Sequence, residues 1–187
     1  MSAVSERRER ERAHRHQLIL TAARELAESE GWDAVTTRRL AERVEYSQPV
    51  LYSHFNGKDA IVSAVALDGF GELAAHLNQA RQAAEPLQSV CRAYLEFATD
   101  RPALYQAMFI LPTDLKFASA ETPPPLRACF DEFVSCFRPD NKRRELIAEV
   151  LWSALHGIAV LSENGRIPSH GQEERLNFLI TQIADAS

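Results

Sequence analysis

Long apolar runs are missing from this sequence, and no apolar stretch lies near its N-terminus. A helix needs about 20 mostly apolar residues to cross a bilayer, and a secretory signal carries an apolar stretch of its own. We therefore expect a cytoplasmic protein with no membrane partner. The fractions of apolar (45%) and charged (25%) residues are ordinary for a globular chain, which excludes a disordered or fibrous class.

Cysteine is scarce, with only Cys91, Cys129 and Cys136, and their spacing matches no metal-binding pattern. On one helix, Cys129 and Cys136 would lie about 10.5 Å apart along the axis, beyond the roughly 4.4–6.8 Å between bridged Cα atoms. We expect buried, reduced thiols, with a redox-sensing thiol as the alternative. Nucleophile elbow, P-loop, dinucleotide and zinc-protease motifs are missing too, so we expect no enzyme, no cofactor and no metal.

Net positive charge is also missing, since the formal charge is −5. The charge is unevenly distributed: residues 1–58 hold ten basic and nine acidic side chains, and residues 59–187 hold eleven and seventeen. An acidic protein can still bind DNA through cations grouped on one face, because phosphate contacts act within about 8–10 Å. The length suits a DNA-reading module of about 50 residues followed by a larger domain.

In most of the sequence, apolar residues recur at the three- and four-residue spacing of a helix, and Pro, Gly and Asn interrupt this pattern. It predicts an all-α fold of about nine helices. A three-helix DNA-binding domain is expected over residues 1–58, and a helical effector-binding and dimerisation domain over residues 59–187. Residues 1–16 are rich in arginine and have no apolar face, so they are expected to be a charged arm before the first helix. That arm either enters a DNA minor groove or stays solvated.

Residues 36–58 (TTRRLAERVEYSQPVLYSHFNGK) have the pattern of a helix-turn-helix. Two short helices follow each other, the first capped by Thr36 or Thr37 and the second by Ser47. Helices this short need to pack on the preceding helix to be stable. The second helix cannot bury all its polar side chains at once, so it presents them outward, as a recognition helix in a major groove does. These side chains are Gln48, Tyr52, Ser53 and His54.

This segment closely resembles the DNA-binding motif of the tetracycline-repressor (TetR) family, through Leu40-Ala41, Ser47 and the run from Tyr52 to Lys58. The resemblance implies that Tyr52, His54 and Lys58 contact phosphates and that Phe55 packs inward. Gln48 is the candidate for reading an adenine edge, and Thr37 for a further phosphate. The predicted DNA-binding residues are Thr37, Arg38, Ser47, Gln48, Pro49, Tyr52, Ser53, His54 and Lys58.

Glu45 departs from the family pattern, which has glycine at this place in the turn because the position tends to be left-handed. A non-glycine residue in that conformation costs roughly 1–2 kcal/mol. Either Glu45 is left-handed, with its carboxylate near DNA phosphates, or the turn is slightly remodelled, which would change the reach of Gln48.

The C-terminal part resembles the ligand-binding region of one branch of the same family, which carries a Trp-x-x-x-His-Gly motif, here Trp152 to Gly157. The resemblance implies that the last two long helices, about 141–163 and 172–186, pair with their copies in a second subunit as a four-helix bundle. The predicted interface residues are Leu146, Ile147, Val150, Leu151, Leu155, Leu179 and Ile180. The predicted effector-pocket residues are Phe97, Tyr105, Met108, Phe109, Phe130, Phe133, Trp152 and His156, with ordinary core as the alternative that helical spacing favours for any single one of them.

The sequence thus predicts a homodimeric repressor that leaves a near-palindromic DNA operator when a small hydrophobic effector binds. A regulator without an effector and an activator remain alternatives, and a helical enzyme is a more distant one.

Overall fold

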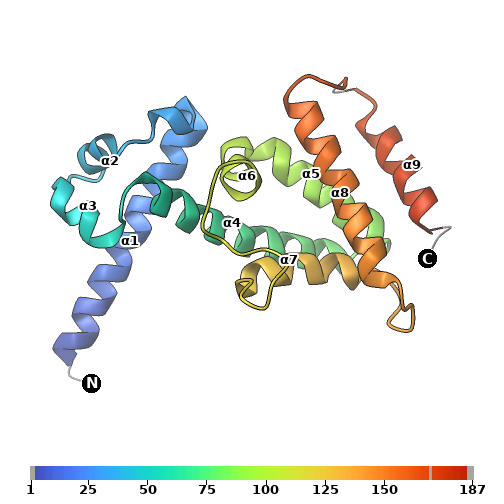
Figure 1. The fold of residues 1–187 in the computed structure, drawn as a ribbon, viewed down its shortest axis with the longest axis horizontal. Helices are drawn as coiled ribbons and strands as arrows, with labels where there is room; N and C mark the ends of the chain where they lie inside the picture. Colours follow the sequence, from blue (N-terminus) through green and yellow to red (C-terminus); the bar gives the residue numbers. More distant parts are fainter. Residues whose placement is uncertain (1–2, 169, 185–187) are drawn as a thin grey trace. The chain divides into compact units, whose positions relative to one another are not determined.

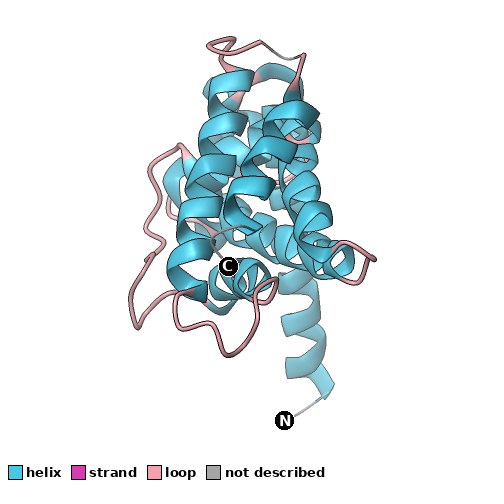
Figure 2. Ribbon diagram, turned by 90° about the vertical axis from the view of Figure 1, so that its right-hand side faces the viewer, coloured by secondary structure: helices cyan, strands magenta, loops and turns pink. Residues whose placement is uncertain are grey.

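The computed structural model describes residues 3–168 and 170–184, and all regular secondary structure within them is helical (Figures 1 and 2). The all-α prediction is confirmed. In chain order the elements are α1 (Ala3–Glu30), the short 3₁₀ helix η1 (Trp32–Ala34), α2 (Thr37–Arg43), α3 (Gln48–His54), α4 (Lys58–Arg81), α5 (Pro86–Asp100), α6 (Pro102–Phe109), α7 (Pro124–Val134), α8 (Arg144–Glu163) and α9 (Gln172–Ala184).

The chain forms two compact units that divide within α4. The first comprises residues 1–67 and 103–115, and the second comprises residues 68–102 and 116–187. The first turns of α4 bury Ile61 and Val65 and belong to the first unit, so this unit extends past the expected boundary at residue 58. The assignment of DNA binding and effector binding to the two parts of the chain remains a prediction.

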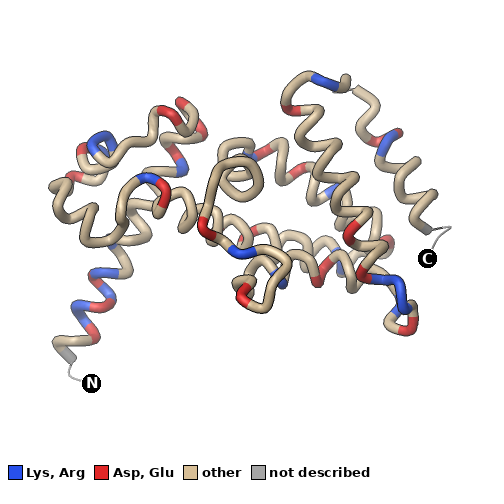
Figure 3. The backbone as a smooth tube through the Cα atoms, in the orientation of Figure 1, with Lys and Arg blue, Asp and Glu red and all other residues tan. Residues whose placement is uncertain are grey.

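The charged N-terminal segment differs from the expectation, because it is helical from Ala3 onward rather than an arm before the helix. Arginine and glutamate are good helix formers, and the Arg7 and Glu11 side chains, one turn apart, form an ion pair of 3.2 Å. Basic and acidic residues alternate along this half of α1 (Figure 3). The segment has no apolar face, as expected, and its side chains are mostly exposed from Val4 to His14. Residues 1–2 lie outside the described part.

The apolar face of α1 forms the core of the first unit. Ile19, Ala23 and Leu26 recur at spacings of three and four residues and are all buried. α1 packs against η1 and α2, and α2 packs against α3. α1 ends before Gly31, which has a positive φ of 81° and donates its N–H to the Ala27 carbonyl at 2.8 Å. Glycine is suited to this cap because it has no Cβ to clash.

The helix α6 belongs to the first unit, although the sequence placed it in the second domain. The Trp32 indole donates a hydrogen bond to the Ala103 carbonyl at 2.7 Å. The Glu28 carboxylate accepts from the backbone N–H groups of Ala103 and Leu104 at 3.3 and 3.1 Å, in the first turn of α6. A carboxylate is favourable there because the N–H groups of a first turn lack partners within the helix.

The second unit is built around α5, which packs against α7, α8 and α9, while α8 lies beside both α7 and α9 (Figure 1). Its buried side chains include Tyr94, Phe133 and Leu151. Ion pairs join its helices: Arg81 of α4 contacts Glu132 of α7 at 2.6 Å, and Arg92 of α5 contacts Glu173 of α9 at 2.9 Å.

By length and composition alone, α4 and α8 would each suffice to cross a membrane. Their apolar side chains have another explanation in this fold. Leu73 and Leu77 of α4, and Ile147 and Leu155 of α8, are buried within the protein, which is how long core helices pass the same test.

Candidate nucleic-acid interface

The helix-turn-helix is positioned by buried residues on its inner side, namely Leu40 and Ala41 of α2 and Leu51 of α3. Thr36 is the N-cap of α2, and its hydroxyl accepts a hydrogen bond from the Arg39 N–H at 3.2 Å. Thr37, the first helical residue, is half-buried. Ser47 is the N-cap residue of α3, as predicted, although its side chain forms no capping hydrogen bond.

The turn between α2 and α3 is left-handed at Glu45, with φ 57°, which favours the first of the two alternatives over a remodelled turn. The Tyr46 N–H donates to the Ala41 carbonyl at 3.0 Å, and the Glu45 N–H donates to the Glu42 carbonyl at 3.4 Å. This pair of bonds is a Schellman motif, in which the residue after the C-cap takes the left-handed conformation. The turn therefore keeps its geometry without glycine.

Replacing Glu45 by glycine is expected to raise the free energy of unfolding by about 0.5–1 kcal/mol, because glycine removes the left-handed penalty but gains entropy in the unfolded chain. Urea denaturation measures the change. Glu45→Ala is the matched control, because it removes the same charge and retains a Cβ. Equal stability of the two variants would contradict the assignment of backbone strain to this residue.

The outer side of α3 is polar and open to solvent. Gln48, Pro49, Tyr52 and Ser53 are exposed, with 54% of Tyr52 accessible, while Phe55 is buried as predicted. The Ser53 hydroxyl donates to the Val50 carbonyl at 2.6 Å. Four neighbouring exposed side chains on a short helix provide the surface that base readout requires.

Two of the predicted phosphate contacts have less freedom than expected. The Lys58 ammonium donates to the Trp32 carbonyl at 2.5 Å, which holds the start of α4 against η1. His54 is half-buried, and its Nδ1 atom is buried without a hydrogen-bond partner. Burial, followed by the charges of His16, Arg12 and Arg15, lowers the pKa of His54 below its ordinary value. At neutral pH, His54 is therefore a neutral hydrogen-bonding group.

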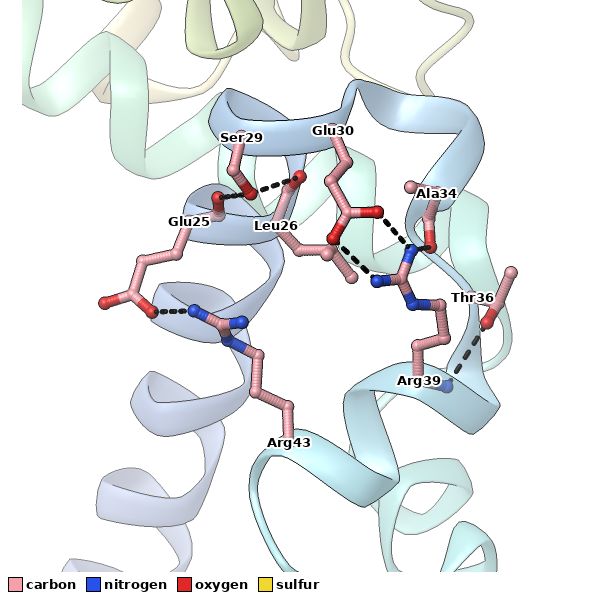
Figure 4. Close-up of polar contacts among 8 residues, drawn as sticks. All are labelled: Glu25, Leu26, Ser29, Glu30, Ala34, Thr36, Arg39 and Arg43. Carbon is pink, nitrogen blue, oxygen red and sulfur yellow. Dashed lines mark hydrogen bonds and ion pairs between the residues drawn. The ribbon is translucent and has the colours of Figure 1, made fainter.

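Each arginine of α2 forms an ion pair with a glutamate of the first unit, and Figure 4 shows the pairs of Arg39 and Arg43. Arg39 forms two hydrogen bonds to the Glu30 carboxylate at 2.7 and 2.9 Å, and Arg43 contacts Glu25 at 2.9 Å. The exposed Arg38 pairs with Glu42 one turn later at 3.0 Å. These pairs join α2 to the end of α1, but they leave little free positive charge on α2.

The residues predicted to line an effector pocket divide between the two units. Tyr105, Met108 and Phe109 lie on α6 in the first unit, where the rings of Tyr105 and Phe109 are 4.7 Å apart. The others lie in the second unit: Phe97 and Phe133 are buried, and Phe130, Trp152 and His156 are half-buried.

A residue missing from that prediction, Tyr94, joins several of the others. Its hydroxyl accepts a hydrogen bond from the Trp152 indole at 3.1 Å and lies 3.5 Å from His156 Nδ1, and its ring meets Phe133 edge-on. The pKa of His156 is lowered by burial, so this histidine is neutral at pH 7. The sequence did not indicate Tyr94 because its hydroxyl partners lie 58 and 62 residues later in the chain.

The predicted dimer-interface residues fall into two sets. Ile147, Leu151 and Leu155 are buried by their own chain, so they cannot form a contact surface for a second subunit, and that part of the prediction is wrong. Leu146 and Val150 lie one turn apart on the other side of α8 and are 50% and 54% exposed. Leu179 and Ile180 of α9 are partly exposed, and Leu161 and Phe178, which were not predicted, are exposed as well.

All three cysteines are unpaired thiols. Burial raises the pKa of Cys91 and of Cys129 to about 12 and that of Cys136 to about 11. The Cys129 thiol donates to the Phe70 carbonyl at 2.9 Å. A thiol with so high a pKa is a poor nucleophile. Within residues 3–168 and 170–184, no group of three His, Cys, Asp or Glu side chains is placed to hold a metal ion.

Two family models match most of the chain. Residues 19–65 match the model described as bacterial regulatory proteins, tetR family, and residues 87–183 match the tetracyclin repressor-like C-terminal domain. The chain belongs to the TetR family. The first match covers the helix-turn-helix, and the second covers most of the second unit and α6, so this protein is a TetR-family transcriptional regulator.

Individual relatives agree with this assignment. An uncharacterized HTH-type transcriptional regulator of Bacillus subtilis, YobS, is 31% identical over 97 residues, which is 50% of each chain. The class G tetracycline repressor of Vibrio anguillarum is 45% identical over 47 residues, which is 25% of this chain and 22% of the repressor. A TetR variant from Acinetobacter baumannii AYE, solved in complex with minocycline, has the same fold, with a TM-score of 0.63 at 21% identity over 89% of this chain and 93% of that one. The chain thus spans half the length of the Bacillus relative and less of the Vibrio repressor.

Proposed function

We propose that this TetR-family protein is a cytoplasmic, homodimeric repressor that binds a near-palindromic DNA operator, leaves it when a small apolar effector binds, and catalyses no reaction. The observation that carries the proposal is the outer side of α3, where Gln48, Pro49, Tyr52 and Ser53 are exposed while Leu51 and Phe55 hold the helix in place. A recognition helix needs this combination of a fixed backbone and free polar side chains.

In the proposed interface, Gln48 reads a base edge, and Pro49 and Ser53 lie beside it in the major groove. Tyr52 contacts the phosphate backbone, together with Thr37 and Ser47 at the helix N-termini. Arg38 can reach a phosphate only by exchanging its Glu42 partner. His54 donates a hydrogen bond as a neutral imidazole, and Lys58 has two further N–H donors besides the one bound to Trp32. The proposed set remains Thr37, Arg38, Ser47, Gln48, Pro49, Tyr52, Ser53, His54 and Lys58.

The proposed dimer uses the exposed apolar side of α8 and α9. It retains Leu146, Val150, Leu179 and Ile180 from the sequence prediction, and it gains Leu161 and Phe178 because these are exposed large apolar side chains on the same two helices. A patch of this kind is costly to leave in water and usually marks a contact surface. A two-fold dimer would present one α3 to each half of the operator.

The proposed effector is small and largely apolar. In the second unit, the group of Tyr94, Phe133, Trp152 and His156 provides aromatic surface with only a few polar atoms, which is the usual composition of a ligand site. Because His156 is neutral, it offers a hydrogen bond rather than a charge. Phe97 and Phe130 of this unit remain proposed contacts. Tyr105, Met108 and Phe109 lie on α6 in the first unit, and their role toward an effector stays a prediction.

Operator variants distinguish base readout from phosphate contact. Gln48→Ala is expected to lose its preference at one base-pair position, where a bidentate contact discriminates by about 1–3 kcal/mol, and to keep it elsewhere. Tyr52→Ala should weaken binding to every duplex alike. Fluorescence anisotropy against a panel of single-base operator substitutions measures both, with Gln48→Glu as a control that keeps the size of the side chain. An unchanged base preference in Gln48→Ala would contradict the proposed role of α3.

A further inference from the structure

The contact between α1 and the end of α3 gathers basic side chains of α1 that lie outside the helix-turn-helix motif. Arg12, Arg15 and His16 are three and four residues apart, which places them on one side of α1. The His16 ring stacks on Phe55 with ring centroids 4.4 Å apart, and its centroid lies 6.1 Å from that of His54. Burial, and after it the neighbouring His16, Arg12 and Arg15 side chains, lowers the pKa of His54, in agreement with these ring contacts.

We call Arg12, Arg15, His16 and His54 the basic cluster, and its permanent charges are those of Arg12 and Arg15. Within the described residues, none of its members forms an ion pair, whereas Arg38, Arg39 and Arg43 of α2 each contact a glutamate. Grouped positive charges without an acid repel one another, and the repulsion falls when an anion binds.

Two buried nitrogen atoms of the cluster also lack hydrogen-bond partners, namely Arg15 Nε and His54 Nδ1. Buried polar atoms are nearly always paired in folded proteins, because leaving one unpaired costs roughly 1–3 kcal/mol. Both the charge and the unpaired donor of Arg15 are satisfied if an acceptor anion binds at this junction.

The shape of α1 decides which part of DNA the cluster can contact. An α-helix with its side chains is about 10–12 Å wide, and the minor groove of B-DNA is about 6 Å wide. Because residues 3–16 are helical, this segment is too wide to lie within the minor groove as an extended arm would, which favours contact with the DNA backbone. The accessible anions of a duplex are then its backbone phosphates.

We propose that Arg12, Arg15 and His16 form, with His54, a binding site for DNA backbone phosphates beside the recognition helix. The proposal rests on the proposed function, because its ligand is the same duplex. It extends the interface to the N-terminal half of α1, which the helix-turn-helix motif does not include.

The double variant Arg12→Ala/Arg15→Ala tests this site. Each phosphate contact contributes about 0.9 to the slope of log K against log salt, which corresponds to roughly fivefold in affinity at 0.15 M salt. We expect the double variant to bind about 10–30-fold more weakly at that salt, with a slope smaller by about 1.8. The loss should be equal for the operator and for a scrambled duplex, because phosphates carry no sequence information.

Two control variants separate this site from general charge and from folding. Arg7→Ala/Arg10→Ala removes two charges from the other side of the same helix and should leave affinity and slope nearly unchanged. Arg12→Lys/Arg15→Lys should retain most of the binding. Wild-type α-helical content by circular dichroism shows that the alanine variant is folded.

Three results would overturn the proposal. The first is an Arg12→Ala/Arg15→Ala variant whose affinity and salt slope equal those of the wild type. If the wild type still discriminates the operator from the scrambled duplex, the proposed function is unaffected by this result. The second is a loss confined to the operator, which indicates base reading by α1. The third is a wild-type protein that does not discriminate the operator at all, in which case the proposed function fails as well.

Discussion

The Trp32→Ala variant is expected to lose about 3–5 kcal/mol of unfolding free energy, the range found when a large buried aromatic side chain is truncated. Trp32 lies in η1, which follows α1 and precedes α2 in the chain, and its side chain is buried. Its indole donates a hydrogen bond to the Ala103 carbonyl in α6. Its own carbonyl accepts the Lys58 ammonium. One residue thus connects η1 to α4 and to α6, so its loss should weaken the whole first unit. Urea denaturation followed by circular dichroism measures the effect.

Trp32→Phe separates the hydrogen bond from the packing. It fills most of the volume but leaves the Ala103 carbonyl without its donor, so a smaller loss of about 1–3 kcal/mol is expected. Glu28→Gln is a second control, because a neutral amide weakens the contact with the first turn of α6 without opening a cavity. If Trp32→Ala were as stable as Trp32→Phe, the proposed importance of the buried ring would be contradicted.

The Leu146→Glu/Val150→Glu variant is expected to be monomeric at concentrations where the wild type is a dimer. Both side chains are about half exposed in the protomer, so the substitutions should leave its folding intact. In the proposed dimer, the carboxylates would become buried without partners, at a cost of about 3–5 kcal/mol, which raises the dissociation constant by roughly 10²–10⁴-fold. Sedimentation-velocity ultracentrifugation measures the oligomeric state.

A matched control places the same two charges on exposed apolar positions of the first unit. Leu18→Glu/Ile110→Glu should dimerise as the wild type does, because Leu18 and Ile110 lie outside α8 and α9. A wild-type dissociation constant in Leu146→Glu/Val150→Glu would show that the subunits meet elsewhere.

The parts of the fold that local sequence determines were predicted well. The inward packing of Phe55 and the exposed polar side of α3 each depend on a few neighbouring residues. The conformation of Glu45 is local too, but for this residue the sequence left a remodelled turn as an alternative. The family resemblance rests on the same local pattern, because the helix caps, the turn and the apolar spacing of residues 36–58 all match a helix-turn-helix.

The parts that depend on contacts distant in the chain could not be predicted. The place of α6 in the first unit rests on Trp32 and Glu28, about 70 residues earlier, and nothing in the Ala103 segment indicates these partners. Both sides of α8 are apolar, so the sequence could not show which side packs within the protomer and which side is left for a partner. Ile147 is buried in the protomer, whereas Val150 is exposed. The helical state of residues 3–16 was missed because a charged run without an apolar face can be either a helix or a coil.

The most direct test of the central claim is a fluorescence-anisotropy titration of the wild-type protein with DNA from upstream of its own gene, at two salt concentrations. A scrambled duplex of the same composition is the control. A sequence-specific regulator binds the upstream duplex at least about 10³-fold more tightly than the scrambled one, and both affinities fall with salt. Equal, weak binding to both duplexes, repeated with sites from a genome-wide binding selection, would contradict the proposed operator recognition.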